Sequence, residues 1–330
     1  MVERAANRYT CSSMADRSIA RLSSAWILLP ITFWGSSFAF TKIALGAFHP
    51  FGLVAARFAL GASLVYAYLL ARREKLLPER GDRPISFFLG CVLGAHLLLQ
   101  GFALRSASAI DSGWIVGFCP VTIALGAQLF LGERLRAIGW LGVLLATVGV
   151  WLVAFAGVTE MVRVQLGDLL VLTSTVTWAV YSLASIGAVA RNGALRVSAF
   201  AMAVGACVCA IASFGTRVVV ATPGWPEIGS VLFLGIFCSG VAFSVWFRAI
   251  EAFGPARIGA LIYLQPFVSL VVGASVLHEP VTSFALLGGP LVLLGVWLVS
   301  RGSPRRKTSD AKPIAAPATP LMVHGDALEK

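Results

Sequence analysis

Long apolar segments alternate with short polar ones along most of this chain. Each apolar segment holds about 18 to 23 residues with few charges, the length that an α-helix needs to cross about 30 Å of hydrocarbon. The pattern predicts an all-α polytopic membrane protein with ten transmembrane helices. Their expected spans are 25–46, 51–71, 85–104, 113–131, 137–157, 169–190, 197–215, 228–247, 258–277 and 281–300.

The chain contains an internal repeat. Residues 99–153 recur as residues 245–299, and both copies end in the segment Gly-Val-Trp-Leu-Val. Because five spans reverse the direction of the chain across a membrane, two five-span copies lie upside down relative to each other. We therefore expect two inverted five-helix repeats around a central cavity. The expected divisions are a tail at 1–24, repeats at 25–157 and 168–300, a linker at 158–167 and a disordered tail at 301–330.

Composition and charge agree with this class. Of the residues, 58% are hydrophobic and 12% are charged, whereas about a quarter are charged in soluble domains. The net charge of +11 comes from basic clusters at 72–83, 134–136, 191–196 and 301–307. All four clusters face the cytoplasm if the N-terminus does, as topology rules require. We expect both tails in the cytoplasm, a location in the plasma (bacterial inner) membrane, and no nucleic-acid partner.

Two repeated segments carry a family resemblance. Residues 113–133 read GWIVGFCPVTIALGAQLFLGE, and residues 259–279 read GALIYLQPFVSLVVGASVLHE. Each has a small residue, a proline in mid-helix and a terminal glutamate, and is followed by a glycine-rich span. This pattern resembles the EamA family of the drug/metabolite transporter superfamily, over about residues 25–300. The resemblance implies a ten-helix fold of two inverted bundles around a cavity that exports or imports amino acids, metabolites or drugs.

The prolines and glutamates of these segments occupy equivalent places in both copies. Pro120 and Pro266 each remove a backbone hydrogen bond and kink the helix, which makes the two helices candidate gates. Static packing around the bend is the alternative. Glu133 and Glu279 precede a helix, so we expect each carboxylate to accept bonds from the first free amides of that helix. Coupling to protons is the other interpretation of these acids.

Lys42 and Arg57 are the cations that lie deepest in the expected spans. They flank the turn at His49-Pro50 at similar distances, so in an antiparallel hairpin both lie roughly 10 Å below the outer surface. A charge at that depth is costly unless it faces a cavity or a partner. Two cations in one cavity would bind an anionic group such as a carboxylate. The alternative is that Lys42 extends to the lipid head groups while Arg57 pairs with Asp111.

Aromatic and amide side chains complete the candidate cavity. Polar side chains within spans usually face the interior of a bundle, although many only bond a neighbouring helix. The Trp34-Gly35 pair and the segment from Trp178 to Tyr181 also resemble the openings of the two family repeats. Besides the two cations, the candidate substrate-binding residues are Trp34, Gln100, Trp178, Tyr181, Tyr263 and Gln265, and His96 and Gln128 are further polar groups in the spans.

We expect a secondary transporter or exporter of amino acids, organic anions or drugs. No nucleotide-binding, metalloprotease or nucleophile-elbow motif occurs in the sequence, so we expect no enzyme activity, cofactor or metal. Alternating access would arise from rocking of the halves, with the fourth and ninth spans as gates. The expected partners are a small solute, the bilayer, and a proton or counter-solute, and a homodimer stays open. The alternatives are a flippase for a lipid-linked molecule, an intramembrane enzyme or a scaffold.

Overall fold

The computed structural model describes residues 25–132, 134–154, 166–253 and 260–302. Within these ranges the elements are helical, apart from one isolated bridge between Phe48 and Val219. The first half contains η1 (Ala25–Ile27), α2 (Leu28–Ala44), α3 (Pro50–Ala71), η2 (Arg80–Asp82), α4 (Arg83–Ala103), α5 (Ala109–Val116), α6 (Cys119–Leu131) and α7 (Ala137–Ala154). The second half contains α8 (Leu166–Asn192), α9 (Ala194–Ala212), α10 (Trp225–Leu232), the π-helix η3 (Phe233–Val241), α11 (Ala242–Phe253), η4 (Ala260–Leu264), α13 (Gln265–Val276) and α14 (Ser283–Gly302).

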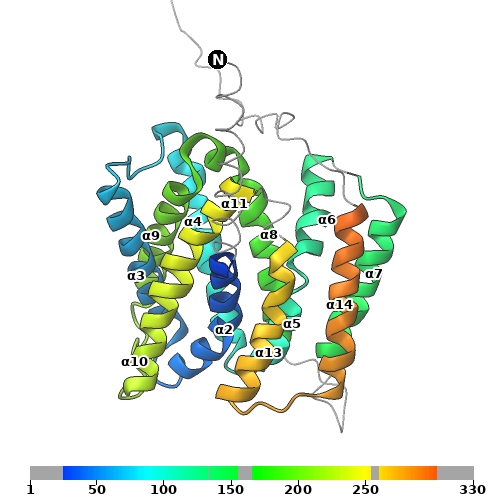
Figure 1. Cartoon of the computed structure of the whole chain (residues 1–330). Helices are drawn as coiled ribbons and strands as arrows, with labels where there is room; N and C mark the ends of the chain where they lie inside the picture. Colours follow the sequence, from blue (N-terminus) through cyan, green and yellow to red (C-terminus); the bar gives the residue numbers. More distant parts are fainter. Residues whose placement is uncertain (1–24, 133, 155–165, 254–259, 303–330) are drawn as a thin grey trace, which may run out of the picture.

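The helices stand side by side between two ends of one bundle (Figure 1). We call one the α3–α4 end, after the connection that it holds, and the opposite one the α13–α14 end. The start of α2 and the last turn of α14 both lie at the α3–α4 end, at the top of Figure 1. The described chain therefore begins and finishes on the same side of the bundle.

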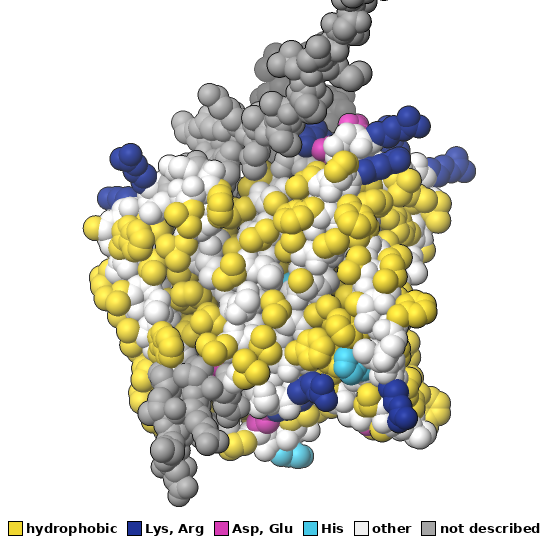
Figure 2. All heavy atoms as spheres, turned by 180° about the vertical axis from the view of Figure 1, so that it is seen from behind, with side chains coloured by type: hydrophobic (Ala, Val, Ile, Leu, Met, Phe, Trp, Pro, Cys, Tyr) yellow, Lys and Arg dark blue, Asp and Glu magenta, His cyan; other side chains and the backbone are white. Residues whose placement is uncertain are grey.

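The surface and the helix lengths identify an all-helical polytopic membrane protein. Among the described residues, seven helical segments are long and apolar enough to cross a membrane, and two shorter apolar helices cover 137–153 and 261–276. Figure 2 shows hydrophobic side chains across the middle of one face, with charged side chains gathered at its two rims. Hydrocarbon covers such a belt without loss, because the helices satisfy their own backbone hydrogen bonds.

The two proline-containing spans are interrupted helices, which differs from the single kinked helix that the sequence predicts. The span expected at 113–131 consists of α5 and α6, separated at Gly117 and Phe118, and Pro120 lies in the first turn of α6. In the same way η4 leads into α13, which has Pro266 in its first turn. Proline is tolerated there because the first amides of a helix have no intrahelical partner.

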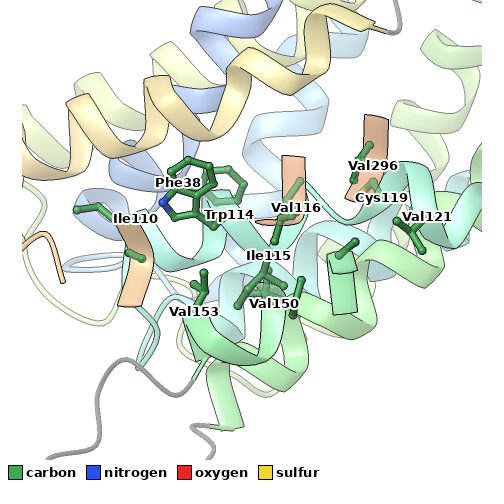
Figure 3. Packing of buried hydrophobic residues seen from close by; sticks show 14 of the residues in the cluster. Phe38, Ile110, Trp114, Ile115, Val116, Cys119, Val121, Val150, Val153 and Val296 are labelled. Atoms are coloured by element: carbon green, nitrogen blue, oxygen red, sulfur yellow. The ribbon is translucent and has the colours of Figure 1, made fainter. Parts of the chain in front are cut away.

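The hydrophobic core joins the two sequence halves. One cluster combines α5, α6 and α7 with α14, and a second combines α3 and α4 with α8 and α9. Figure 3 shows Trp114 and Ile115 of α5 among Val150 of α7 and Val296 of α14. Because both clusters draw on both halves, neither sequence half forms a packing unit of its own.

Glycines allow α7 and α14 to touch backbone to backbone. A Cβ atom at Gly142 would lie 2.5 Å from the Gly295 carbonyl oxygen, and one at Gly295 would lie 2.4 Å from the Ala146 amide nitrogen. Neither obstacle is the end of a flexible side chain that can turn aside. The two repeated glycine-rich segments are therefore the contact surfaces of these two helices.

Gly142→Leu should destabilise the protein by about 3 kcal/mol, because a larger side chain there forces the two backbones apart. The measurement is the melting temperature of the purified protein in detergent. Gly81→Leu is the matched control, since a Cβ atom at Gly81 meets nothing within 4 Å. Equal melting temperatures for the two variants would show that α7 and α14 do not depend on this close approach.

Candidate functional site

A cavity lies at the centre of the bundle, where α2, α3, α4 and α8 meet the interrupted segments. The space open to the centre of a water molecule is about 100 Å³, and a single water needs about 10–15 Å³ on that measure. The cavity therefore has room for several waters or a small solute. Its lining is Trp34, Ser37, Phe38, Arg57, Phe58, Leu93, His96, Leu97, Gln100, Val116, Cys119, Pro120, Ile123, Trp178, Phe243, Ile262 and Gln265.

Arg57 brings a positive charge into this cavity. Its side chain projects from the middle of α3, the residue is only 7% exposed, and Nε donates a 3.0 Å hydrogen bond to Ser239 Oγ. The two ion pairs found among the described residues involve other side chains, and the cavity lining contains no acidic residue. Arginine stays protonated in proteins. The cavity thus holds a buried cation that lacks a carboxylate partner within the described part of the chain.

A polar network fixes the opposite wall of the cavity. His96 Nδ1 lies 2.9 Å from the Ser174 carbonyl oxygen, so this nitrogen carries the proton and donates it. The Gln100 amide nitrogen lies 3.3 Å from His96 Nε2, which in this tautomer accepts. Trp178 packs on the His96 ring with 5.3 Å between the centroids. These contacts hold an imidazole and an amide in fixed positions at the cavity wall.

Trp34 and Ser37 form the wall contributed by α2. Trp34 Nε1 donates a 2.9 Å hydrogen bond to the Cys238 carbonyl oxygen, and its ring packs against Phe243. Ser37 Oγ donates to the Trp34 carbonyl oxygen one turn back. With Gln265 at the start of α13, the cavity offers one cation, two amides and several aromatic faces. Such a lining suits a small amphipathic solute with an anionic group.

The structure places several of the expected site residues at the cavity and others elsewhere. Tyr181 is buried beside Ser198 Oγ and stacks on Trp178, and Tyr263 packs against the α5–α7 and α14 core. Gln128 Oε1 accepts a bond from the Leu135 amide. Glu133 lies outside the described residues. The expected residues in the lining are Trp34, Arg57, Gln100, Pro120, Trp178 and Gln265, and those outside it are Lys42, Tyr181, Tyr263, Pro266 and Glu279.

Sequence reasoning did not single out Ser37, Cys119 and Phe243 for the lining. Ser37 follows Trp34 by three residues, a spacing that puts both on one face of a helix, so this signal was present. Cys119 adjoins Pro120, but a buried thiol in an apolar run carries no distinguishing pattern. Phe243 reaches the cavity only because α11 packs against α2, which is a tertiary contact.

Lys42 and Glu279 form an ion pair at the α13–α14 end, which corrects two expectations. Lys42 Nζ lies 2.6 Å from Glu279 Oε1, so Lys42 does not join Arg57 in the cavity. Glu279 also accepts bonds from the amides of Ala109 and Ile110, at 3.0 and 3.1 Å. The carboxylate therefore caps α5 of the other sequence half instead of the helix that follows it. The free amides and positive end of α5 explain the attraction.

These bonds determine the ionisation of Glu279. Burial opposes its charge, but the hydrogen bonds from Lys42 and from the amides of Ala109 and Ile110 outweigh that effect. The pKa of Glu279 consequently lies below that of an ordinary glutamate. The carboxylate is charged at neutral pH and holds α2, α5 and the α13–α14 connection together.

A second ion pair joins the sequence halves at the α3–α4 end. Arg191 Nη2 lies 2.5 Å from Asp82 Oδ1, and Arg191 Nε donates to Asp82 Oδ2 at 2.9 Å. The Asn192 amide donates to the same carboxylate at 2.7 Å. Among the described residues, each end of the bundle is thus bridged by one ion pair, with the cavity between the two bridges.

An apolar helical bundle with a cationic cavity between two polar bridges defines a membrane transporter. The comparisons with known proteins agree with this class. The chain belongs to the EamA-like transporter family, whose pattern matches residues 21–155 and again residues 165–301. The expected family resemblance is confirmed.

The relatives of this chain are transporters along nearly their whole length. It is 26% identical to the uncharacterised transporter YyaM of Bacillus subtilis, over 81% of this chain and 90% of that protein. It is 28% identical to a probable terminal-alkyne amino-acid exporter of Streptantibioticus cattleyicolor, over 89% of this chain and 99% of the exporter. A protein of known crystal structure matches with a TM-score of 0.62 and 26% identity, over 83% of this chain and 96% of its own.

Proposed function

We propose that this protein is a secondary transporter for small amphipathic solutes that carry a carboxylate or another anionic group. The observation that supports this proposal is the buried Arg57 guanidinium, which faces the cavity without a carboxylate partner among the described residues. A buried charge is stable only beside a counter-ion or water. An anionic solute would supply the counter-ion, while Trp34, Trp178 and Phe243 would cover its apolar part.

The proposed architecture has ten spans in two inverted repeats, with both tails in the cytoplasm. Helices occupy each of the ten expected spans, and the described chain begins and finishes at the α3–α4 end. The connections at that end carry the basic clusters around 72–83, 134–136 and 191–196. The positive-inside rule assigns that end to the cytoplasm.

Alternating access would use the two interrupted spans as gates. A Cβ atom at Gly117, in the break between α5 and α6, would lie 3.4 Å from Pro266 Cγ. The two breaks therefore meet beside the cavity, where short helical segments can tilt without moving the packed clusters. In this mechanism the bridges at the two ends open in turn, and solute passes between the cavity and one side at a time.

Solute counterflow in proteoliposomes tests the proposed function. The panel consists of radiolabelled amino acids, organic anions and neutral solutes of similar size, and an amino-acid solute agrees with the name of the exporter relative. We expect exchange of at least one anionic or zwitterionic solute and weaker exchange of neutral ones. Folded protein that exchanges none of them would contradict the proposal.

A further inference from the structure

Asp168 is a buried acid that the cavity does not use. It is the third residue of α8, is 6% exposed, and its Oδ1 atom has no hydrogen-bond partner. No ion pair of the described residues includes it. A carboxylate that loses its hydration and gains no donor is unstable as an anion, and binding a proton removes the penalty.

The surroundings of Asp168 add negative charge. The Asp111 carboxylate on α5 is close enough to repel it, and Glu279 in turn acts on Asp111. Lys42 is already engaged by Glu279, and Arg105 on the connection before α5 is exposed. The remaining titratable groups on helices that pack against α8 and lie nearest its first half are His96, Cys119 and Cys209.

None of those groups supplies Asp168 with a counter-charge. His96 is held by Ser174, about 9 Å further along α8 at 1.5 Å per residue, and the two thiols are buried. Three carboxylates therefore share one ammonium group at this end of the bundle. No three acidic, histidine or cysteine side chains within the described part of the chain could hold a metal ion together.

We propose that the carboxyl pair Asp168 and Asp111 is a proton-binding site that couples solute transport to proton movement. With one proton, Asp168 remains neutral and can donate to the Asp111 carboxylate, which relieves both the burial and the repulsion. The Lys42–Glu279 bridge lies beside the pair and caps the same helix α5. Opening of this bridge admits water, so that the proton enters or leaves when the α13–α14 end is open. The inference rests on the proposed transport function.

Asp168→Asn is the informative variant, because asparagine imitates the protonated acid in size and charge. We expect counterflow of the anionic solute to continue, since exchange requires no net proton movement. Accumulation driven by an imposed pH gradient, which wild-type protein should show for one gradient polarity, should be lost. Asp111→Asn should behave in the same way. The melting temperature of Asp168→Asn should not fall, because no ion pair is removed.

Two control variants make the result specific. Glu227→Gln changes an acid that is likewise the third residue of a helix, α10, but bonds the Gly224 amide. It should retain gradient-driven accumulation. Arg163→Gln removes a cation five positions before Asp168 in the sequence, outside the described residues. It should also retain accumulation, and a loss matching that of Asp168→Asn would show that Asp168 acts as an ion-pair partner and overturn the proposal.

The outcomes separate this inference from the function on which it rests. Wild-type protein without counterflow would contradict the transport function itself. Wild-type counterflow without any response to a pH gradient of either polarity would overturn only the proton site. Accumulation driven by a sodium gradient, and abolished when choline replaces sodium, would assign the acid pair to sodium and also overturn it. Full gradient-driven accumulation by Asp168→Asn would do the same.

Discussion

Arg57→Gln should abolish measurable counterflow of anionic solutes and leave exchange of neutral solutes near the wild-type level. Glutamine keeps a polar side chain of similar reach but removes the cavity's buried guanidinium charge. Loss of a charge-assisted hydrogen bond in a buried site costs about 3 kcal/mol, which corresponds to roughly a hundredfold weaker binding. The measurement is the initial rate of counterflow as a function of solute concentration for both solute classes.

Two further arginine variants control this result. Arg57→Lys retains the charge but loses the planar fork, so it should give intermediate affinity for anions. Arg248→Gln removes an exposed arginine that lies over the Tyr68 ring, outside the central cavity, and should exchange both solute classes normally. Equal losses of anionic and neutral exchange in Arg57→Gln would return Arg57 to a structural role through its bond to Ser239.

Glu279→Gln should open the α13–α14 end and lower the stability of the protein. The substitution removes the charge that binds Lys42 and the first amides of α5, which is worth about 2 kcal/mol for hydrogen bonds to a charged group. The measurements are the melting temperature and the accessibility of the cavity from the α13–α14 side. Both should change in the same direction in Lys42→Met, though less, because Lys42 is partly exposed.

The stabilisation by Glu279 also has a predictable pH dependence. Because its pKa is lower in the folded protein than in the unfolded chain, the stabilisation is complete above the ordinary glutamate value of about 4.3. It is lost as the pH falls below that value and through the lowered pKa. The wild-type melting temperature should therefore fall in this acid range more than that of Glu279→Gln. Parallel pH profiles of the two proteins would contradict the bridge.

Much of the fold is written in local sequence patterns. A run of about 20 apolar residues predicts a membrane helix because every backbone polar group must be satisfied within it. The same rule made Arg57 conspicuous, since a charge inside such a run needs a cavity or a partner. Pro120 and Pro266 marked where two helices depart from regular geometry. Their exact form, a break followed by a new helix, depended on tertiary packing.

The partners of Lys42 and Glu279 could not be deduced from local patterns. These residues are 237 positions apart in the chain, so their contact depends on how two distant spans are placed side by side. Tyr181 shows a second limit. Its helix is apolar on all sides, and periodicity then gives no reason to choose between a face toward the cavity and a face toward α9. In the structure it faces Ser198 of α9.

Accessibility of position 37 is the most direct measurement of alternating access. Ser37 lines the cavity from α2 and carries no charge, so Ser37→Cys in a chain whose native cysteines are replaced provides a reporter there. Membrane-impermeant maleimide should label this cysteine from either face of oriented vesicles, and a transported solute should slow labelling from both. Labelling confined to one face under every solute and pH condition would contradict a cavity that opens to each side in turn.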